Sequence, residues 1–285
     1  MAIIDILGVP HAYDLTAPTG SPYILVFIHG WLLSRHYWQP LIERLAPDYQ
    51  CLTYDLRGFG DSQRDSAKPQ FHPSYTPATY ARDLITLLDK LEITSAWLIG
   101  HSLGGTIALW GASYLEDVVK GVICVNSGGG IYIKEEFERF RFAGQQFLKI
   151  RPRWLCYLRW LDLLFARDSV ANPIELKWGR QRLIDFVSAH PDAALGALLD
   201  STTEEEIHRL PKLVSQMEQP AYFVAGSEDK IMEPKYVRHL ASFHSLFQGG
   251  DENVTVLSEC GHLSMVEQPD AMAREIRRIL ESNRD

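Results

Sequence analysis

Apolar, strand-like segments that alternate with amphipathic helical segments limit most strongly how this chain can fold. Near-continuous apolar runs, which are typical of strands buried on both faces, occur at 23–29, 50–56, 95–100 and 121–126. Helical spacing of apolar residues occurs between them, at 36–46, at 77–91 and after Gly100. Alternation of this kind implies right-handed crossovers. It therefore predicts a mainly parallel sheet covered by helices on both faces.

A purely helical block interrupts the alternation. Helical stretches are predicted at about 134–149, 152–167, 173–188, 191–200 and, less clearly marked, 204–216. Strand patterns precede the block as a hairpin (2–7 and 10–16) and resume after it at 221–226 and 253–257, before a last helix at 269–282. We therefore expect an eight-stranded core formed by residues 1–130 and 219–285, and an inserted helical cap at 131–218 over the edge of the sheet.

Composition narrows the classes of protein to which the chain can belong. The 285 residues are 46% hydrophobic and carry a formal net charge of −8; a nucleic-acid-binding protein would usually be basic, so none is expected as a partner. The first residues predict a strand rather than a secretory signal, and no run of 18 apolar residues is present. We expect a cytoplasmic protein, in a reducing compartment that fits four scattered cysteines: Cys51, Cys124, Cys156 and Cys260.

A candidate nucleophile lies where a strand is followed directly by a helix. Gly100-His101-Ser102-Leu103-Gly104 matches G-x-S-x-G, and the motif follows one apolar strand and opens the next helix. A sharp turn there would lift the Ser102 hydroxyl clear of the sheet, at the positive end of the helix dipole. We predict that Ser102 is a catalytic nucleophile rather than an ordinary cap in a glycine-rich turn.

A serine hydroxyl needs a base to take its proton. On a fold of this kind the base comes after the last strand and the orienting acid after a late strand. His262 follows the strand at 253–257, and Asp229 follows the strand at 221–226, with Glu228 as its rival. The alternative acid position, after the strand at 121–126, holds Asn126, which cannot be an anion.

The loop after the strand at 23–29 is the expected source of an oxyanion hole. We predict that the backbone N–H groups of Trp31 and Leu103 bind the developing negative charge. His29, Gly30 and His101 are further candidates for the substrate pocket. For His29 we prefer a role in tying this loop down by hydrogen bonds.

These motifs together carry a family resemblance. HGW, YDLRGFGDS, GHSLGG, GSEDKI and CGH occur in this order, and with them the chain resembles the capped α/β-hydrolase superfamily over nearly all its length except the cap. The stretches HGWLLSRHYW and TYDLRGFGDS are similar to cofactor-free haloperoxidase-type and carboxylesterase-type members. GHSLGG is also similar to the chlorophyll-dephytylase and pheophytinase group. The resemblance implies the α/β-hydrolase fold, a Ser–His–Asp triad, and neither metal nor cofactor. Relatives that open epoxides carry an Asp nucleophile where this chain has Ser102.

The expected reaction is hydrolysis of a small-molecule carboxylic ester, with a hydrophobic portion, through an acyl-enzyme. Other triad chemistry (hydrolysis of a C–C bond, perhydrolysis or a lyase step) and a non-catalytic hydrolase-like receptor remain alternatives. Residues 134–167 carry eight Lys or Arg against four acids, with aromatic residues between them. This segment is either a cap helix packed on the sheet edge or a surface that meets an anionic membrane. The sequence leaves the oligomeric state open.

Overall fold

The computed structural model describes residues 1–63, 74–129, 134–247 and 253–283. An eight-stranded sheet has the order β1-β2-β4-β3-β5-β6-β7-β8. The pairs β1–β2 and β2–β4 are antiparallel and every other pair is parallel. The strands are β1 (Ala2–Ile6), β2 (Val9–Leu15), β3 (Ile24–Ile28), β4 (Cys51–Tyr54), β5 (Ala96–His101), β6 (Val119–Val125), β7 (Ala221–Gly226) and β8 (Val254–Leu257).

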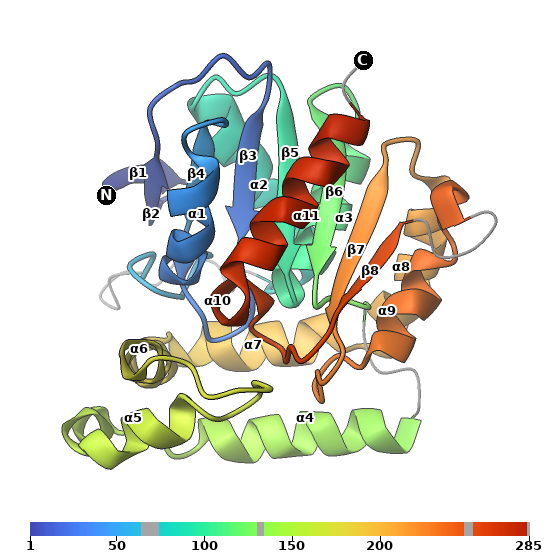
Figure 1. Cartoon of the computed structure of the whole chain (residues 1–285). Helices are drawn as coiled ribbons and strands as arrows, with labels where there is room; N and C mark the ends of the chain where they lie inside the picture. The colour runs from blue at the N-terminus through green and yellow to red at the C-terminus, as the bar shows by residue number, and fades with distance from the viewer. Residues whose placement is uncertain (64–73, 130–133, 248–252, 284–285) are drawn as a thin grey trace.

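Helices cover both faces of the sheet (Figure 1). One face carries α1 (Gln39–Leu45), α10 (Ser264–Glu267) and α11 (Pro269–Ser282). The other face carries α2 (Pro77–Lys90), α3 (Leu103–Tyr114), α8 (Glu204–Gln216) and α9 (Pro234–Ala241). Short 3-10 turns are η1 (Arg35–Trp38), η2 (Arg153–Tyr157) and η3 (Ser245–Phe247).

The central strand β3 is apolar at every position because its two faces pack into separate cores. In β3, Val26 and Ile28 belong to the cluster under α2 and α3, whereas Leu25 and Phe27 belong to the cluster under α1 and α11. All four side chains are fully buried. A strand with period-two alternation could not fill two cores, which explains the continuous runs in the sequence. The predicted α/β-hydrolase fold, with its mostly parallel eight-stranded sheet, is confirmed.

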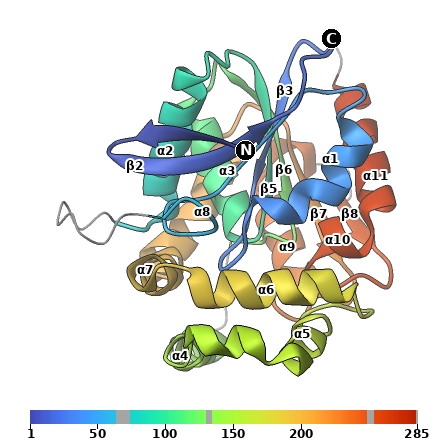
Figure 2. The same cartoon turned by 90° about the vertical axis from the view of Figure 1, so that its left-hand side faces the viewer.

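Four of the helices described between β6 and β7 lie at the end of the sheet to which the strands β3 and β5 point (Figures 1 and 2). They are α4 (Lys134–Leu148), α5 (Arg159–Phe165), α6 (Leu176–Ser188) and α7 (Pro191–Ser201). α6 and α7 lie nearer the sheet, and α4 and α5 form the outermost layer (Figure 2). α8, the last helix of the expected cap, instead packs against α3 and α9 beside the sheet. The boundary at 130 and 131 lies outside the described residues.

One helix prediction is wrong, and one helix was missed. The stretch 152–167 is not one helix, because Leu158 (φ −88°, ψ 85°) separates η2 from α5. The helix α9 was not predicted, although its buried residues Tyr236, Val237, Leu240 and Ala241 recur at helical spacing behind Pro234.

Candidate active site

Ser102 occupies a strained turn between β5 and α3. Its backbone angles, φ 52° and ψ −119°, are uncommon for a residue with a side chain. The turn also brings Gly104 close to β3: a Cβ on Gly104 would lie 2.2 Å from the carbonyl oxygen of Ile28. A glycine is therefore required there. The fold maintains strain at Ser102 and places it at the first turn of a helix, as expected for a functional position.

Asp229 and His262 come from neighbouring strands and meet at the same end of the sheet. Asp229 follows β7 and His262 follows β8. Nδ1 of His262 lies 2.7 Å from Oδ2 of Asp229, a hydrogen-bonded and charge-complementary contact. The bond fixes the proton of a neutral imidazole on Nδ1 and leaves Nε2 as the nitrogen able to accept one. His262 and Ser102 line one cavity.

The Asp229 carboxylate is held by several donors. The backbone N–H groups of Ile231 and Met232 each donate to Oδ1 at 2.9 Å. The Asn126 side-chain amide donates to Oδ2, also at 2.9 Å. Burial alone would raise the pKa of Asp229, but the His262 ring and these hydrogen bonds outweigh it, so the pKa of Asp229 is lowered. The carboxylate is thus an anion next to the imidazole at neutral pH.

Asn126 is a site residue whose contacts the sequence did not reveal. Its amide also donates to the carbonyl of Gly261, next to His262, at 3.1 Å. Its oxygen accepts from the Ser264 hydroxyl at 2.5 Å. Asn126 therefore connects the end of β6 with the loops that carry Asp229 and His262.

His101 forms a hydrogen bond with the backbone of the loop that carries His262. Burial, followed by the proximity of His262, lowers the pKa of His101 to about 3, so its ring is neutral. Nε2 lies 2.7 Å from the carbonyl oxygen of His262 and must be the protonated nitrogen, because a carbonyl only accepts. Nδ1 is then an acceptor, and it finds no hydrogen-bond partner among the described residues. His101 is one of the residues that line the cavity.

The two residues predicted to form an oxyanion hole line the cavity with Ser102. Trp31 lies in the loop after β3, and its indole Nε1 donates to the carbonyl of Ala194 in α7 at 2.8 Å. Leu103 is the first residue of α3, where a backbone N–H has no partner within the helix. Their assignment as oxyanion donors stays a prediction.

His29 and Gly30, which were predicted as substrate-pocket residues, are not among the residues that line this cavity. His29 is fully buried, and its Nε2 accepts from the Leu56 N–H at 2.9 Å. Its Nδ1 can then donate to the carbonyl of Gly30 at 2.8 Å, the loop-tying role that we preferred. Gly30 packs on the Ser102 turn: a Cβ there would lie 2.8 Å from Nδ1 of His101.

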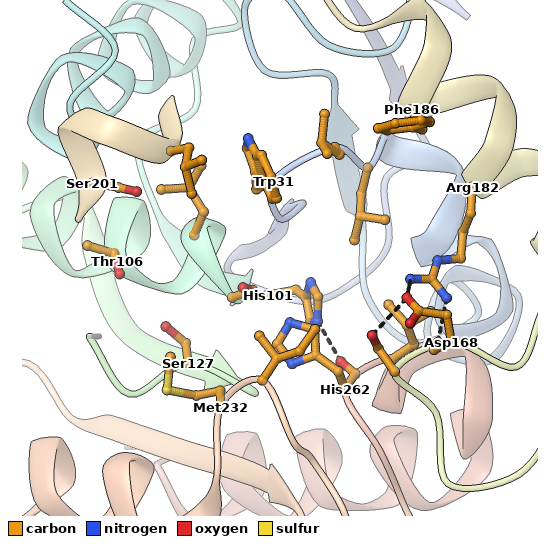
Figure 3. Close-up of a pocket in the computed structure, with 18 of the residues that line it drawn as sticks. Trp31, His101, Thr106, Ser127, Asp168, Arg182, Phe186, Ser201, Met232 and His262 are labelled. Carbon is orange, nitrogen blue, oxygen red and sulfur yellow. Dashed lines mark hydrogen bonds and ion pairs between the residues drawn. The ribbon is translucent and has the colours of Figure 1, made fainter. Parts of the chain in front are cut away.

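The cavity holds about 230 Å³. Figure 3 shows Thr106, Ser127 and Ser201 on one side of it and the Arg182–Asp168 pair on the other. Nη2 of Arg182 lies 2.9 Å from Oδ2 of Asp168, so the pair adds no net charge to the wall. Most of the lining is apolar, from the core and from the inserted helices: Trp31, Leu32, Leu33, Leu103, Phe147, Phe165, Phe186, Leu198, Ile231, Met232 and Leu263.

Comparison with known proteins places the chain in a family. Residues 25–275 match the alpha/beta hydrolase family. The chain belongs to this family. The hydrolase is 25% identical over 256 residues to the uncharacterized hydrolase YugF of Bacillus subtilis (strain 168), with 88% of each chain aligned. It is 23% identical over 261 residues to the probable esterase D14L of Oryza sativa subsp. japonica. This alignment covers 88% of this hydrolase and 89% of that protein.

Solved structures share the fold of this hydrolase. A thermophilic esterase from Thermogutta terrifontis superimposes with a TM-score of 0.77 at 21% identity and covers 100% of both chains. A bromoperoxidase from Bacillus anthracis superimposes with a TM-score of 0.78 at 19% identity, over 98% of this chain and 99% of that chain. Within the ranges that the structure describes, no three His, Cys, Asp or Glu side chains are grouped so that they could hold a metal ion. None of the helices described is long and apolar enough to cross a membrane.

Proposed function

We propose that this hydrolase cleaves carboxylic esters through an acyl-enzyme formed on Ser102. The observation that carries the proposal is the Asp229–His262 hydrogen bond beside the cavity that Ser102 lines. Among similar proteins, the probable esterase D14L and the Thermogutta esterase support ester chemistry over the wider range found on this fold.

The residues divide the reaction into two steps. Nε2 of His262 takes the proton of the Ser102 hydroxyl as its oxygen attacks the ester carbonyl. The proton then passes to the leaving alcohol, and the acyl group remains on Ser102. Water attacks the acyl-enzyme, gives a proton to His262, and releases the carboxylic acid while the hydroxyl regains its proton. Asp229 keeps the imidazole in the required tautomer and stabilises the imidazolium.

The backbone N–H groups of Trp31 and Leu103 stabilise the oxyanion of both tetrahedral intermediates. Removing one such donor from a serine hydrolase costs about 3–4 kcal/mol at the barrier. Since both donors are backbone groups, the geometry of the Trp31 loop matters more than its side chain.

The cavity indicates a compact apolar acyl group. Its volume of about 230 Å³ lies below the range of roughly 300–1,000 Å³ typical of sites for drug-sized ligands. Its wall is largely apolar, and Arg182 is neutralised by Asp168. A short or medium-length acyl chain therefore fits better than a free carboxylate or a bulky lipid.

The test combines covalent labelling with steady-state kinetics. A fluorophosphonate should label the protein once and p-nitrophenyl esters should be hydrolysed, with both activities lost in Ser102→Ala. The control is Ser113→Ala, since Ser113 lies in the same helix, donates its hydroxyl to the Trp110 carbonyl and is not among the residues that line the cavity. Labelling without turnover of any ester would favour other triad chemistry. Absence of labelling in the intact protein would favour a hydrolase-like receptor.

A further inference from the structure

The helices α4 and α5 form the outermost layer of the molecule (Figures 1 and 2). Large apolar side chains of these helices, and of the chain between them, are exposed. Tyr157 is 85% exposed, and Trp154 and Trp160 are close to 60% exposed, at 57% and 60%. We call the following side chains the apolar patch: Phe142, Ile150, Trp154, Tyr157, Trp160, Leu163 and Leu164. An exposed group of this kind on one layer marks an interaction surface.

The segment that carries the apolar patch is also rich in positive charge. Residues 138–167 contain seven Arg or Lys and two acidic residues, in a chain whose net charge is −8. One of the acids, Asp162, is buried and lies 3.5 Å from Arg180. Within the segment, the cations with exposed side chains are Arg139, Lys149, Arg153, Arg159 and Arg167.

We propose that the apolar patch docks this protein on the surface of an anionic phospholipid membrane. Tryptophan and tyrosine favour the boundary between headgroups and acyl chains, while Arg and Lys extend their charged ends toward lipid phosphates. Each basic residue near an anionic surface strengthens the attraction. The patch lies on short helices parallel to the outer face, so the contact is peripheral and shallow.

A second copy of the chain fits this surface less well. A symmetric dimer built on the patch would bring the cation-rich surfaces of the two copies together, because the same patch is used on both. Like charges at an interface are destabilising. An anionic lipid surface provides the complementary charge.

The docking is independent of the proposed chemistry, so it is tested by binding to vesicles. In sedimentation assays, the full chain should bind vesicles of phosphatidylcholine that contain one third phosphatidylglycerol. It should bind vesicles of phosphatidylcholine alone weakly. Binding to the anionic vesicles should decrease as the salt concentration rises. Binding should shift tryptophan emission to shorter wavelength. The same binding by Ser102→Ala would separate docking from turnover.

Two sets of variants locate the surface. The triple change Trp154→Ser, Tyr157→Ser and Trp160→Ser should weaken vesicle binding at least about tenfold, as should Arg153→Glu, Arg159→Glu and Arg167→Glu together. The matched controls, which should bind normally, change exposed residues elsewhere: Ile3→Ser with Leu7→Ser and Tyr114→Ser, and Arg82→Glu with Lys120→Glu and Lys212→Glu. Since every replaced side chain is exposed, thermal unfolding should change little.

Three results would overturn the proposal. One is failure of the protein to bind anionic vesicles. Another is equal binding by the patch variants and the controls. The third is a concentration-dependent dimer in lipid-free solution that the Trp154, Tyr157 and Trp160 changes dissociate, because the patch would then be occupied by a second copy.

Discussion

The Asn126 amide donates to Oδ2 of Asp229, the same carboxylate oxygen that faces Nδ1 of His262. A polar side chain at the end of β6 therefore lies next to the acid that follows β7. The two side chains have the same shape: Asn126 carries an amide nitrogen where an aspartate would carry a second oxygen. A carboxylate at residue 126, at the end of the neighbouring strand β6, would thus lie close to the His262 imidazole.

This arrangement predicts that the acid can be partly relocated. Asp229→Asn should lower kcat/KM for an ester substrate by about three to four orders of magnitude, because the amide favours the wrong imidazole tautomer. Adding Asn126→Asp should recover at least about tenfold of that loss, because a single carboxylate again faces the ring. Recovery will be incomplete, since the donor to Gly261 is lost. A double variant no more active than Asp229→Asn would contradict the prediction.

Gly30→Ala should impair activity much more than stability. Its Cβ would lie 2.8 Å from Nδ1 of His101 and 3.2 Å from Cβ of Ser102, so the loop that carries Trp31 must move away. Displacing one oxyanion donor should lower kcat by about 10²–10³. The comparison is Gly20→Ala, where a new Cβ meets no described atom within 4 Å. If both variants keep the parental kcat, the Trp31 N–H is not an oxyanion donor.

Phe186→Ala should shift the preference of the enzyme toward longer esters. Phe186 lines the cavity and stacks on Phe147 with ring centroids 4.1 Å apart. Removing the ring enlarges the space for an acyl chain, and it should also destabilise the protein by about 3–5 kcal/mol if the cavity does not collapse. A p-nitrophenyl ester series measured well below the melting temperature would reveal the shift. If the preferred acyl chain length is unchanged in the variant, the acyl group does not bind beside Phe186.

Asp185 predicts a pH dependence of stability. This α6 residue accepts hydrogen bonds from Ser34 and Gln181, both at 2.9 Å, and burial raises its pKa to about 7. Between the ordinary value of 3.8 and about 7, the folded protein binds this proton more strongly than the unfolded chain. Stability from this group is therefore present at low pH and declines as pH rises through that window.

Asp185→Asn should remove that decline, because the amide cannot ionise. Urea unfolding between about pH 5 and pH 8 should show a smaller loss of stability in the variant than in the parent protein. The difference should reach at most a few kcal/mol, since one pKa unit corresponds to about 1.4 kcal/mol. Parallel pH profiles for the two proteins would show that Asp185 does not titrate in this window.

Local patterns were sufficient to predict much of the fold. Each core strand is an apolar run of the sequence, and the turn around Ser102 carries its own signature in Gly100 and Gly104. Asp229 and His262 could be proposed because each follows a strand that is recognisable by itself. The assignments depended on residues close together in sequence, for which spacing is informative.

Contacts between distant segments could not be predicted in this way. The helix expected at 152–167 is broken where the Arg180 guanidinium, from α6, donates to the carbonyl of Cys156. A continuous helix would instead satisfy that carbonyl with a backbone N–H from its next turn. Likewise, the contact of His101 with the His262 carbonyl joins residues 161 positions apart. The spacing of residues along one sequence gives no information about contacts between segments so far apart.

The bond from the Trp31 indole to the Ala194 carbonyl has a consequence for protein engineering. It joins the loop after β3, which lines the cavity with Ser102, to the inserted helices, so the two parts cannot be exchanged independently. A chimera that takes its helical insert from another hydrolase must place a backbone carbonyl where that of Ala194 lies. Without one, the grafted enzyme should lose turnover even with substrates that its new pocket accommodates.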